Sequence, residues 1–148
     1  MSEEKSDFWI WGKTETKPRI LHTMTRVKDL EKSIEFYCEC LGMKELSRFD
    51  SETGRFTLCF LGYDDFSSPC IELTHNWDVD QYELGDAYGH LAIGVPNIHE
   101  ACTRIVEAGY EVTLQPKAMI EGAPKLAFAK DPDGYLIEFI ETNAMAPQ

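Results

Sequence analysis

The stretch Tyr88-Gly89-His90-Leu91-Ala92-Ile93-Gly94-Val95 decides the fold, because at His90 the chain begins to repeat what it began at His22. Four positions after each histidine match in type and offset: Val27, Asp29, Leu30 and Ser33 in the first half, and Val95, Asn97, Ile98 and Ala101 in the second. Each half then reaches a glutamate between apolar residues, Glu72 at 72 − 22 = 50 residues and Glu138 at 138 − 90 = 48 residues. A period of 90 − 22 = 68 residues is too long for a solenoid unit and indicates two pseudo-symmetric modules, each with one His and one Glu.

Composition excludes several classes of function. The chain has 148 residues and a net charge of −12, which argues against nucleic acid or an anionic membrane as a partner, since both require a basic surface. No apolar run approaches the roughly 20 residues of a membrane span, and the start Met1-Ser2-Glu3-Glu4-Lys5 lacks the pattern of a signal peptide. We therefore expect a cytoplasmic globular protein.

The five cysteines are an odd number and include no CxxC pair, so they predict neither a disulfide framework nor a zinc knuckle. We expect reduced, partly buried thiols and no catalytic cysteine.

The first module is expected to span residues 20–80, after an N-terminal arm of residues 1–19. A strand is predicted over residues 20–27, then a helix that Asp29 caps and Gly42 ends, then strands over 43–49, 56–63 and 70–77. In the arm, the apolar segment Phe8-Trp9-Ile10-Trp11 favours docking on the body or on a partner subunit over a partly ordered tail.

The second module, with the C-terminal tail, is expected to span residues 81–148. It repeats the order with a strand over 89–95, a helix that Asn97 caps and that ends near Gly109, and strands over 110–114, 126–130 and 135–141. Residues 118–124 are predicted as a loop, and Asp131-Pro132-Asp133-Gly134 as a tight turn. The predicted fold class is therefore α+β, with two pseudo-symmetric βαβββ modules.

The two His–Glu pairs form a set of two nitrogen and two oxygen donors. Such a set suits a first-row divalent metal ion and leaves room for two waters in octahedral geometry. A lone His on a strand is more often structural, but four such residues in register across a repeat favour metal ligation. Strand alternation also places Arg26 on the face of His22, and Thr74 and Asn76 on the face of Glu72.

Several spaced motifs over about residues 20–141 resemble the glyoxalase I (lactoylglutathione lyase) family of the vicinal oxygen chelate superfamily. These motifs are His22-Thr23-Met24-x-Arg26-Val27, Phe36-Tyr37 with Leu41-Gly42-Met43, Ile71-Glu72-Leu73-Thr74-x-Asn76-Trp77, Tyr88-Gly89-His90 and Asp131-Pro132-Asp133-Gly134-Tyr135-x-Ile137-Glu138. The resemblance implies the paired βαβββ fold, a homodimer with its sites at the subunit interface, and isomerisation of the hemithioacetal of methylglyoxal and glutathione to S-lactoylglutathione.

The resemblance also assigns roles to the site residues. It implies that His22, Glu72, His90 and Glu138 bind the metal, and that Glu138 is the main proton shuttle while Glu72 serves the opposite face of the substrate. A histidine at position 22 resembles the type activated by nickel or cobalt rather than the zinc type.

Glutathione binding is assigned in the same way. Arg26 and Asn76 match the family's peptide-binding residues, and Lys117 and Lys125 are weaker candidates for the glycyl carboxylate. The sequence departs from some family members at Asp86, where they have an arginine.

Other functions on the same fold remain open from sequence. A thioester epimerase shares the proton chemistry, an extradiol dioxygenase would want three protein ligands on iron, and a non-catalytic module would only bind a small molecule. Four ligands argue against the dioxygenase, and a binding module would give Glu138 no chemical task.

Overall fold

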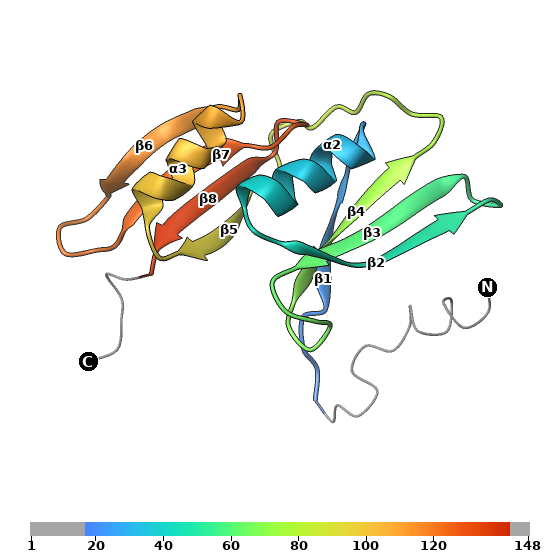
Figure 1. The fold of residues 1–148 in the computed structure, drawn as a ribbon, viewed down its shortest axis with the longest axis horizontal. Helices are drawn as coiled ribbons and strands as arrows, with labels where there is room; N and C mark the ends of the chain where they lie inside the picture. The colour runs from blue at the N-terminus through green and yellow to red at the C-terminus, as the bar shows by residue number, and fades with distance from the viewer. Residues whose placement is uncertain (1–16, 143–148) are drawn as a thin grey trace. The chain divides into compact units, whose positions relative to one another are not determined.

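The computed structural model describes residues 17–142 and divides the chain into two compact units, the first ending at Tyr82 and the second beginning at Glu83 (Figure 1). The predicted docking of Phe8-Trp9-Ile10-Trp11 on the body or on a partner subunit concerns residues outside the described range, so it stays a prediction.

The first unit is a four-stranded sheet with one helical segment. Its strands lie in the order β1-β4-β3-β2; β1 runs parallel to β4, and the other neighbours are antiparallel. In chain order the elements are β1 (His22–Arg26), α2 (Leu30–Glu35), the π-helix η1 (Phe36–Cys40), β2 (Lys44–Ser51), β3 (Phe56–Gly62) and β4 (Cys70–Asn76).

The second unit repeats this topology. Its strands lie in the order β5-β8-β7-β6, again with the first pair parallel and the others antiparallel. The elements are β5 (His90–Val95), α3 (Ile98–Glu107), β6 (Val112–Ala118), β7 (Lys125–Lys130) and β8 (Leu136–Glu141). The predicted α+β class with two βαβββ modules is confirmed.

Both helices begin at the residues that the sequence indicated. The Asp29 side chain accepts a hydrogen bond from the backbone N–H of Lys32 at 3.1 Å, and the Asn97 side chain accepts one from Glu100 at 3.0 Å. Each cap satisfies an amide that the first helical turn would otherwise leave unpaired. The helical segments end near Gly42, with φ +76°, and Gly109, with φ +90°, where the left-handed backbone favours glycine.

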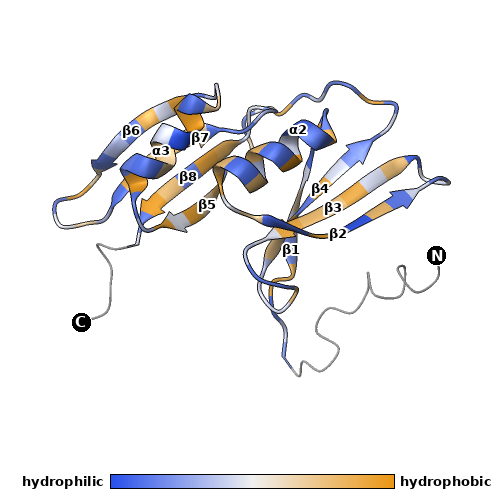
Figure 2. Cartoon of the chain, in the orientation of Figure 1, coloured by the Kyte–Doolittle hydropathy of each residue, from blue (hydrophilic) through white to orange (hydrophobic). Residues whose placement is uncertain are grey.

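One face of each sheet forms the core with the helix of its own unit. The fully buried apolar side chains on this face include Cys59, Leu61 and Leu73 in the first unit and Ala127, Ile137 and Phe139 in the second. In Figure 2, hydrophobic residues run along β3 and β8, each of which is one of the two interior strands of its sheet. Because side chains alternate along a strand, the intervening residues lie on the opposite face.

The structure differs from the prediction at β6. The strand was expected to end at residue 114, but it continues to Ala118, the first residue of the predicted loop. Pro116 hid this part of the strand, because proline cannot donate to a sheet ladder and normally argues against a strand. The strand tolerates Pro116 because β6 is an edge strand, and its pairing with β7 shifts register twice, between Val112 and Leu114 and between Leu114 and Lys117.

A second difference concerns the first helix, which widens into a π-helix from Phe36 to Cys40 instead of continuing as an α-helix. Its end is closed by backbone hydrogen bonds from Gly42 to Cys38 and from Met43 to Tyr37.

All five cysteines are free, and Cys38 alone among them is only half-buried. Burial raises the pKa of the Cys59 thiol to about 12, and it also raises the pKa of Cys102. Raised pKa values make these thiols poor nucleophiles. In the part of the chain that the structure describes, no helix is both long and apolar enough to cross a membrane; the cytoplasmic location stays a prediction.

Candidate metal and active site

The first predicted pair, His22 and Glu72, lies on the adjacent parallel strands β1 and β4. The pairing of β1 with β4 sets Met24 beside Glu72, so Glu72 lies diagonally from His22 on the same face of the sheet. His22 Nε2 is 2.9 Å from Glu72 Oε1. The carboxylate is the more shielded partner, with 13% of its side chain exposed against 29% for the imidazole.

The second pair, His90 and Glu138, reproduces this geometry on β5 and β8. Ala92 pairs with Glu138, which again sets the carboxylate diagonally from the histidine. His90 Nε2 is 3.0 Å from Glu138 Oε1, with 41% and 13% of the side chains exposed. The sequence repeat is therefore a repeat of donor geometry as well.

These two pairs fit a metal ion by the spacing of their donors. Two donors about 2.1 Å from one ion and at right angles to each other lie about 3 Å apart, close to the separation in each pair. Neutral imidazole and carboxylate also suit a borderline divalent ion. Among residues 17–142, no group of three or more His, Cys, Asp or Glu side chains gathers, so each pair is a half-site of two donors.

A phenylalanine ring packs against the histidine of each half-site, and this contact was not predicted from the sequence. Phe60 on β3 pairs with Glu72, and its ring meets His22 edge-on at 5.2 Å between centroids. Phe128 on β7 pairs with Glu138 and meets His90 in the same way, also at 5.2 Å. The repeat itself held the signal, since 60 − 22 = 38 and 128 − 90 = 38. Three adjacent strands thus supply His, Glu and Phe in both units.

The polar residues predicted for glutathione lie on the same face of the first sheet. Arg26 pairs with Thr74 across β1 and β4, and Asn76 follows Thr74 by two residues on β4. Arg26 is exposed, and the Asn76 amide donates a hydrogen bond to the Tyr82 hydroxyl at 2.9 Å. A cation and an amide therefore lie on the face that carries the His22–Glu72 pair.

On the corresponding face of the second sheet, Gly94 stands where the first sheet has Arg26, so no cation lies at that position. A side chain at Gly94 would meet the methyl group of Thr142 at 2.6 Å. Thr142 is fixed there, because its backbone N–H donates to the Val95 carbonyl at 2.8 Å. Gly94 thus makes room for a side chain of its own unit.

The two lysine candidates lie on opposite faces of the second sheet. Lys117 pairs with Leu126, which shares the face of Phe128 and therefore that of His90. Lys125 is one residue from Leu126 and lies on the opposite face, where its Nζ is 3.4 Å from Nε2 of His99 on α3. Of the two, Lys117 is on the face of the second half-site.

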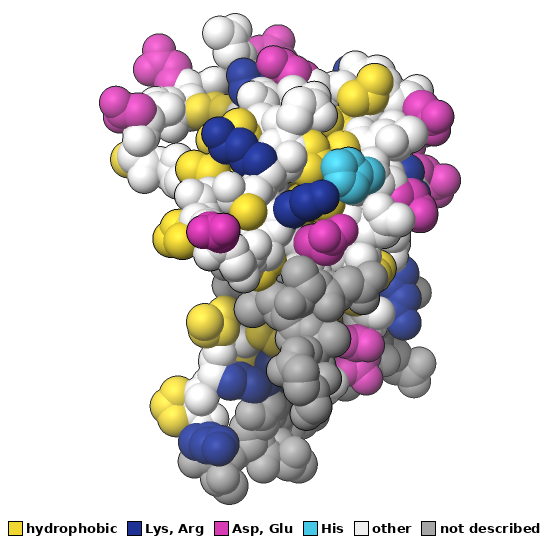
Figure 3. Space-filling model, turned by 90° about the vertical axis from the view of Figure 1, so that its left-hand side faces the viewer, with side chains coloured by type: hydrophobic (Ala, Val, Ile, Leu, Met, Phe, Trp, Pro, Cys, Tyr) yellow, Lys and Arg dark blue, Asp and Glu magenta, His cyan; other side chains and the backbone are white. Residues whose placement is uncertain are grey.

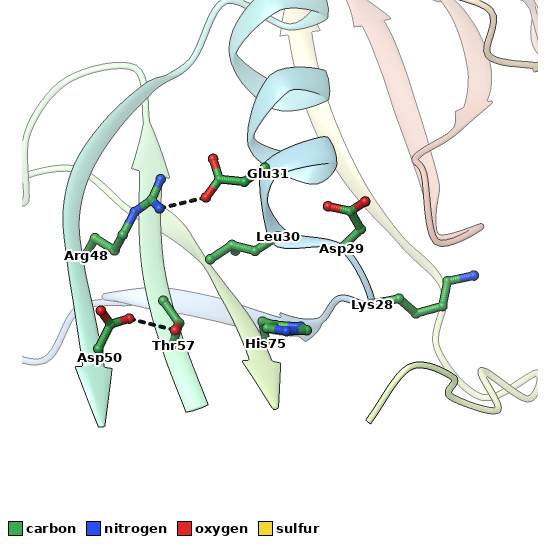
Figure 4. Close-up of a pocket in the computed structure, with 8 residues that line it drawn as sticks. All are labelled: Lys28, Asp29, Leu30, Glu31, Arg48, Asp50, Thr57 and His75. Carbon is green, nitrogen blue, oxygen red and sulfur yellow. Dashed lines mark hydrogen bonds and ion pairs between the residues drawn. The ribbon is translucent and has the colours of Figure 1, made fainter. Parts of the chain in front are cut away.

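A polar cavity of about 420 Å³ lies elsewhere in the first unit (Figure 4). Its lining includes Thr57 and His75, which pair across β3 and β4 three residues from Phe60 and Glu72, and so lie on the opposite face. Its polar groups bond to one another: Arg48 Nη1 is 2.7 Å from the carboxylate of Glu31, and the Thr57 hydroxyl donates to a carboxylate at 2.7 Å. The cavity is therefore separate from the candidate metal site.

No large basic patch appears on the face drawn in Figure 3, where Lys and Arg side chains are scattered among acidic, apolar and other ones. This distribution agrees with the net charge of −12 and gives no support for a nucleic-acid partner.

In sequence, this chain is similar to enzymes named lactoylglutathione lyase. The chain is 52% identical over 127 residues to the lactoylglutathione lyase of Neisseria meningitidis, covering 85% of this chain and 92% of the relative. It is 48% identical to the lactoylglutathione lyase of Escherichia coli O157:H7, covering 83% and 92%.

Among solved structures, the trypanothione-dependent glyoxalase I of Leishmania major superposes with a TM-score of 0.78 at 42% identity, covering 87% of this chain and 90% of that one. A mutant glyoxalase I of Zea mays superposes with a TM-score of 0.81 at 37% identity; 95% of this chain is covered, but it spans only about half of the maize chain, 49%. The family model of the glyoxalase/bleomycin resistance protein/dioxygenase superfamily matches residues 19–139, and this chain therefore belongs to that superfamily.

Proposed function

We propose that this protein is a lactoylglutathione lyase, a metal-dependent enzyme that isomerises the hemithioacetal of methylglyoxal and glutathione to S-lactoylglutathione. Relatives with about half of their residues identical over most of the chain carry that name. The structural observation that carries the proposal is the duplicated His–Glu pair, with matched donor distances of 2.9 and 3.0 Å.

The metal site is assembled from four ligands: His22 and Glu72 of one subunit, and His90 and Glu138 of its partner in a homodimer. Each half-site offers only two donors, so a complete set needs a second half-site. Exposed apolar side chains beside the first half-site support a partner that covers it, since Ile20 is 71% exposed and Met24, next to Glu72 in register, is 37% exposed.

The reaction requires a base and a stabilised enediolate. A carboxylate removes the proton from the carbon that carries sulfur and hydroxyl, and the electron pair forms the carbon–carbon double bond as the neighbouring carbonyl oxygen becomes anionic. Return of the proton to that neighbouring carbon, together with transfer of the hydroxyl proton to the neighbouring oxygen, gives the thioester carbonyl and a secondary alcohol, with no net oxidation. Glu138 is the main proton carrier and Glu72 faces the other side of the substrate; general-base help of this kind contributes roughly 10² to 10⁴ in rate.

The bound ion supplies Lewis-acid stabilisation of the developing negative charge. Nickel or cobalt is favoured over zinc, because a histidine at position 22 gives a two-nitrogen, two-oxygen set suited to six-coordination.

The chain's own residues hold the substrate's peptide. Arg26 and Asn76 bind the γ-glutamyl end, on the face of the first half-site. Lys117 is the better candidate for the glycyl carboxylate, because Lys125 lies on the helix side of its sheet beside His99. Glutathione is the proposed thiol; the trypanothione-dependent relative makes the trypanothione adduct the alternative to test.

The deciding experiment measures thioester formation by ultraviolet absorbance with the full chain. A chelator should abolish turnover, and nickel or cobalt should restore it well above the level that zinc restores. Glutathione and trypanothione hemithioacetals are compared side by side, with epimerisation of a coenzyme A thioester as the rival activity. Thioester epimerisation without isomerisation would overturn the proposed function, and best activity with zinc would overturn the choice of metal.

The proton-transfer role is tested by Glu138→Gln at saturating metal. Removal of the base should lower kcat by at least about 10². The matched variant is Glu141→Gln on the same strand, whose carboxylate instead accepts a hydrogen bond from the backbone N–H of Ile98 at 3.1 Å. Near-normal turnover of the Glu138 variant with metal bound would place the base elsewhere.

A further inference from the structure

The two glutamates of the half-sites have the same exposure but different hydrogen bonding. Each has 13% of its side chain exposed. Glu72 is held at both oxygens: Oε1 is 2.9 Å from His22 Nε2, and Oε2 accepts a hydrogen bond from the Thr74 hydroxyl at 3.1 Å. Thr74 can reach it because residues two apart on a strand share a face.

Glu138 has only the first of these contacts. Its Oε1 is 3.0 Å from His90 Nε2, and none of the described residues donates a hydrogen bond to its second oxygen. The position that corresponds to Thr74, two residues after the glutamate, is Ile140, which has no hydroxyl group. The pseudo-symmetry of the half-sites is therefore broken at one side chain.

Burial strengthens this difference. Thr74 is 7% exposed, so water competes poorly for its hydroxyl, and a hydrogen bond to a carboxylate in such a setting is stronger than one at the surface. If Glu72 turns away from His22 toward a substrate, it breaks the bond to Thr74 as well. If Glu138 makes the same movement, it breaks no such bond.

We propose that Thr74 is a positioning residue that fixes Glu72 as a permanent ligand and so leaves proton transfer to Glu138. This inference rests on the proposed function, because it concerns the division of labour between two carboxylates of the same site. Thr74 acts through Glu72 and does not itself touch the reacting atoms.

The first test measures metal binding by calorimetry with metal-free full-length protein and nickel, without any turnover. Thr74→Val keeps the shape of the side chain and removes the hydroxyl, so nickel affinity should fall about tenfold, as expected for the loss of a hydrogen bond to a charged group. Thr74→Ser keeps the hydroxyl and should bind nickel within about twofold of the wild type. Thr25→Val, on β1 and on the other face of the sheet, is the matched control for a Thr-to-Val change.

The second test asks whether a released Glu72 can replace Glu138. In a Glu138→Gln background at saturating nickel, adding Thr74→Val should raise the residual kcat about tenfold, whereas adding Thr25→Val should not. The reciprocal variant Ile140→Thr places a hydroxyl beside Glu138 and should lower kcat about tenfold with little change in KM.

Two results would overturn the inference: nickel affinity of Thr74→Val equal to that of the wild type, or no gain in kcat from Thr74→Val in the Glu138→Gln background. If Thr74→Val does not fold, Ile140→Thr decides, and unchanged kcat in that variant overturns the inference. A wild-type chain that binds nickel but shows no isomerase activity would instead refute the proposed function, and the calorimetry would still test Thr74.

Discussion

Replacing Phe60 with leucine removes the ring that stands edge-on to His22, and Phe128→Leu does the same to His90. Each ring lies 5.2 Å from its imidazole, an arrangement that typically contributes about 0.5–1.5 kcal/mol beyond area burial. The ring also limits how the imidazole can rotate, so its loss should weaken the orientation of Nε2 toward the glutamate. Converted at 1.36 kcal/mol per decade, this contribution corresponds to about a two- to twelvefold loss of metal affinity for each variant.

The two variants should differ in stability but not in their effect on the metal. Phe60 is 1% exposed and also packs against Phe66 at 5.6 Å, so Phe60→Leu should cost about 2–3 kcal/mol of unfolding free energy. Phe128 is only half-buried, so Phe128→Leu should lower the unfolding free energy by less. Because the half-sites lie in separate units, the losses of metal affinity should multiply in the double variant to about 4- to 150-fold.

Calorimetric titration of the metal-free protein with nickel, together with urea unfolding, measures both quantities. Phe139→Leu is the control, because Phe139 is fully buried next to Glu138 in sequence but lies on the opposite face. It should lose stability and keep its metal affinity. A loss of metal affinity in Phe139→Leu as large as that in Phe128→Leu would refute the role given to the rings.

Three other outcomes are expected. His22→Ala and His90→Ala homodimers should each be inactive, but their co-refolded mixture should regain activity, since one site of the heterodimer keeps all four ligands; a mixture that exchanges subunits without any gain would rule out a shared site. Lys117→Ala should raise KM for the glutathione hemithioacetal about fivefold or more, while Lys125→Ala leaves it within about twofold, and the reverse order would exchange their roles. Burial raises the pKa of Cys59 from 9.0 to about 12, so above pH 9 the folded state keeps a proton that the unfolded chain releases, and the stability due to this thiol is complete below pH 9 and is lost as the pH rises toward 12. The unfolding free energies of the wild type and Cys59→Ala should therefore converge over this range by up to about 1.4 kcal/mol per pH unit. Curves of unfolding free energy against pH that stay parallel would contradict the raised pKa of Cys59.

Local chemistry made much of the fold readable in advance. Asp29 and Asn97 cap the two helices as predicted, because a short acceptor side chain just before a helix can accept a hydrogen bond from an unpaired N–H of the first turn. The turn at Asp131 was equally clear, and its carboxylate accepts hydrogen bonds from the backbone N–H groups of Asp133 and Tyr135. The end of β6 could not be predicted in this way, because a strand accepts a proline such as Pro116 at a sheet edge or a bulge, and both are tertiary properties.

The sequence by itself determined the repeat, and with it the module topology and the pairing of one His with one Glu in each half. These features depend on spacing and alternation, which the chain carries locally. Only the tertiary structure decided which strands lie side by side, and that adjacency brings Phe60 to His22, Phe128 to His90 and Thr74 to Glu72. It also separated Lys117 from Lys125, because two register shifts along β6 set the face that a side chain takes, and no local pattern records them.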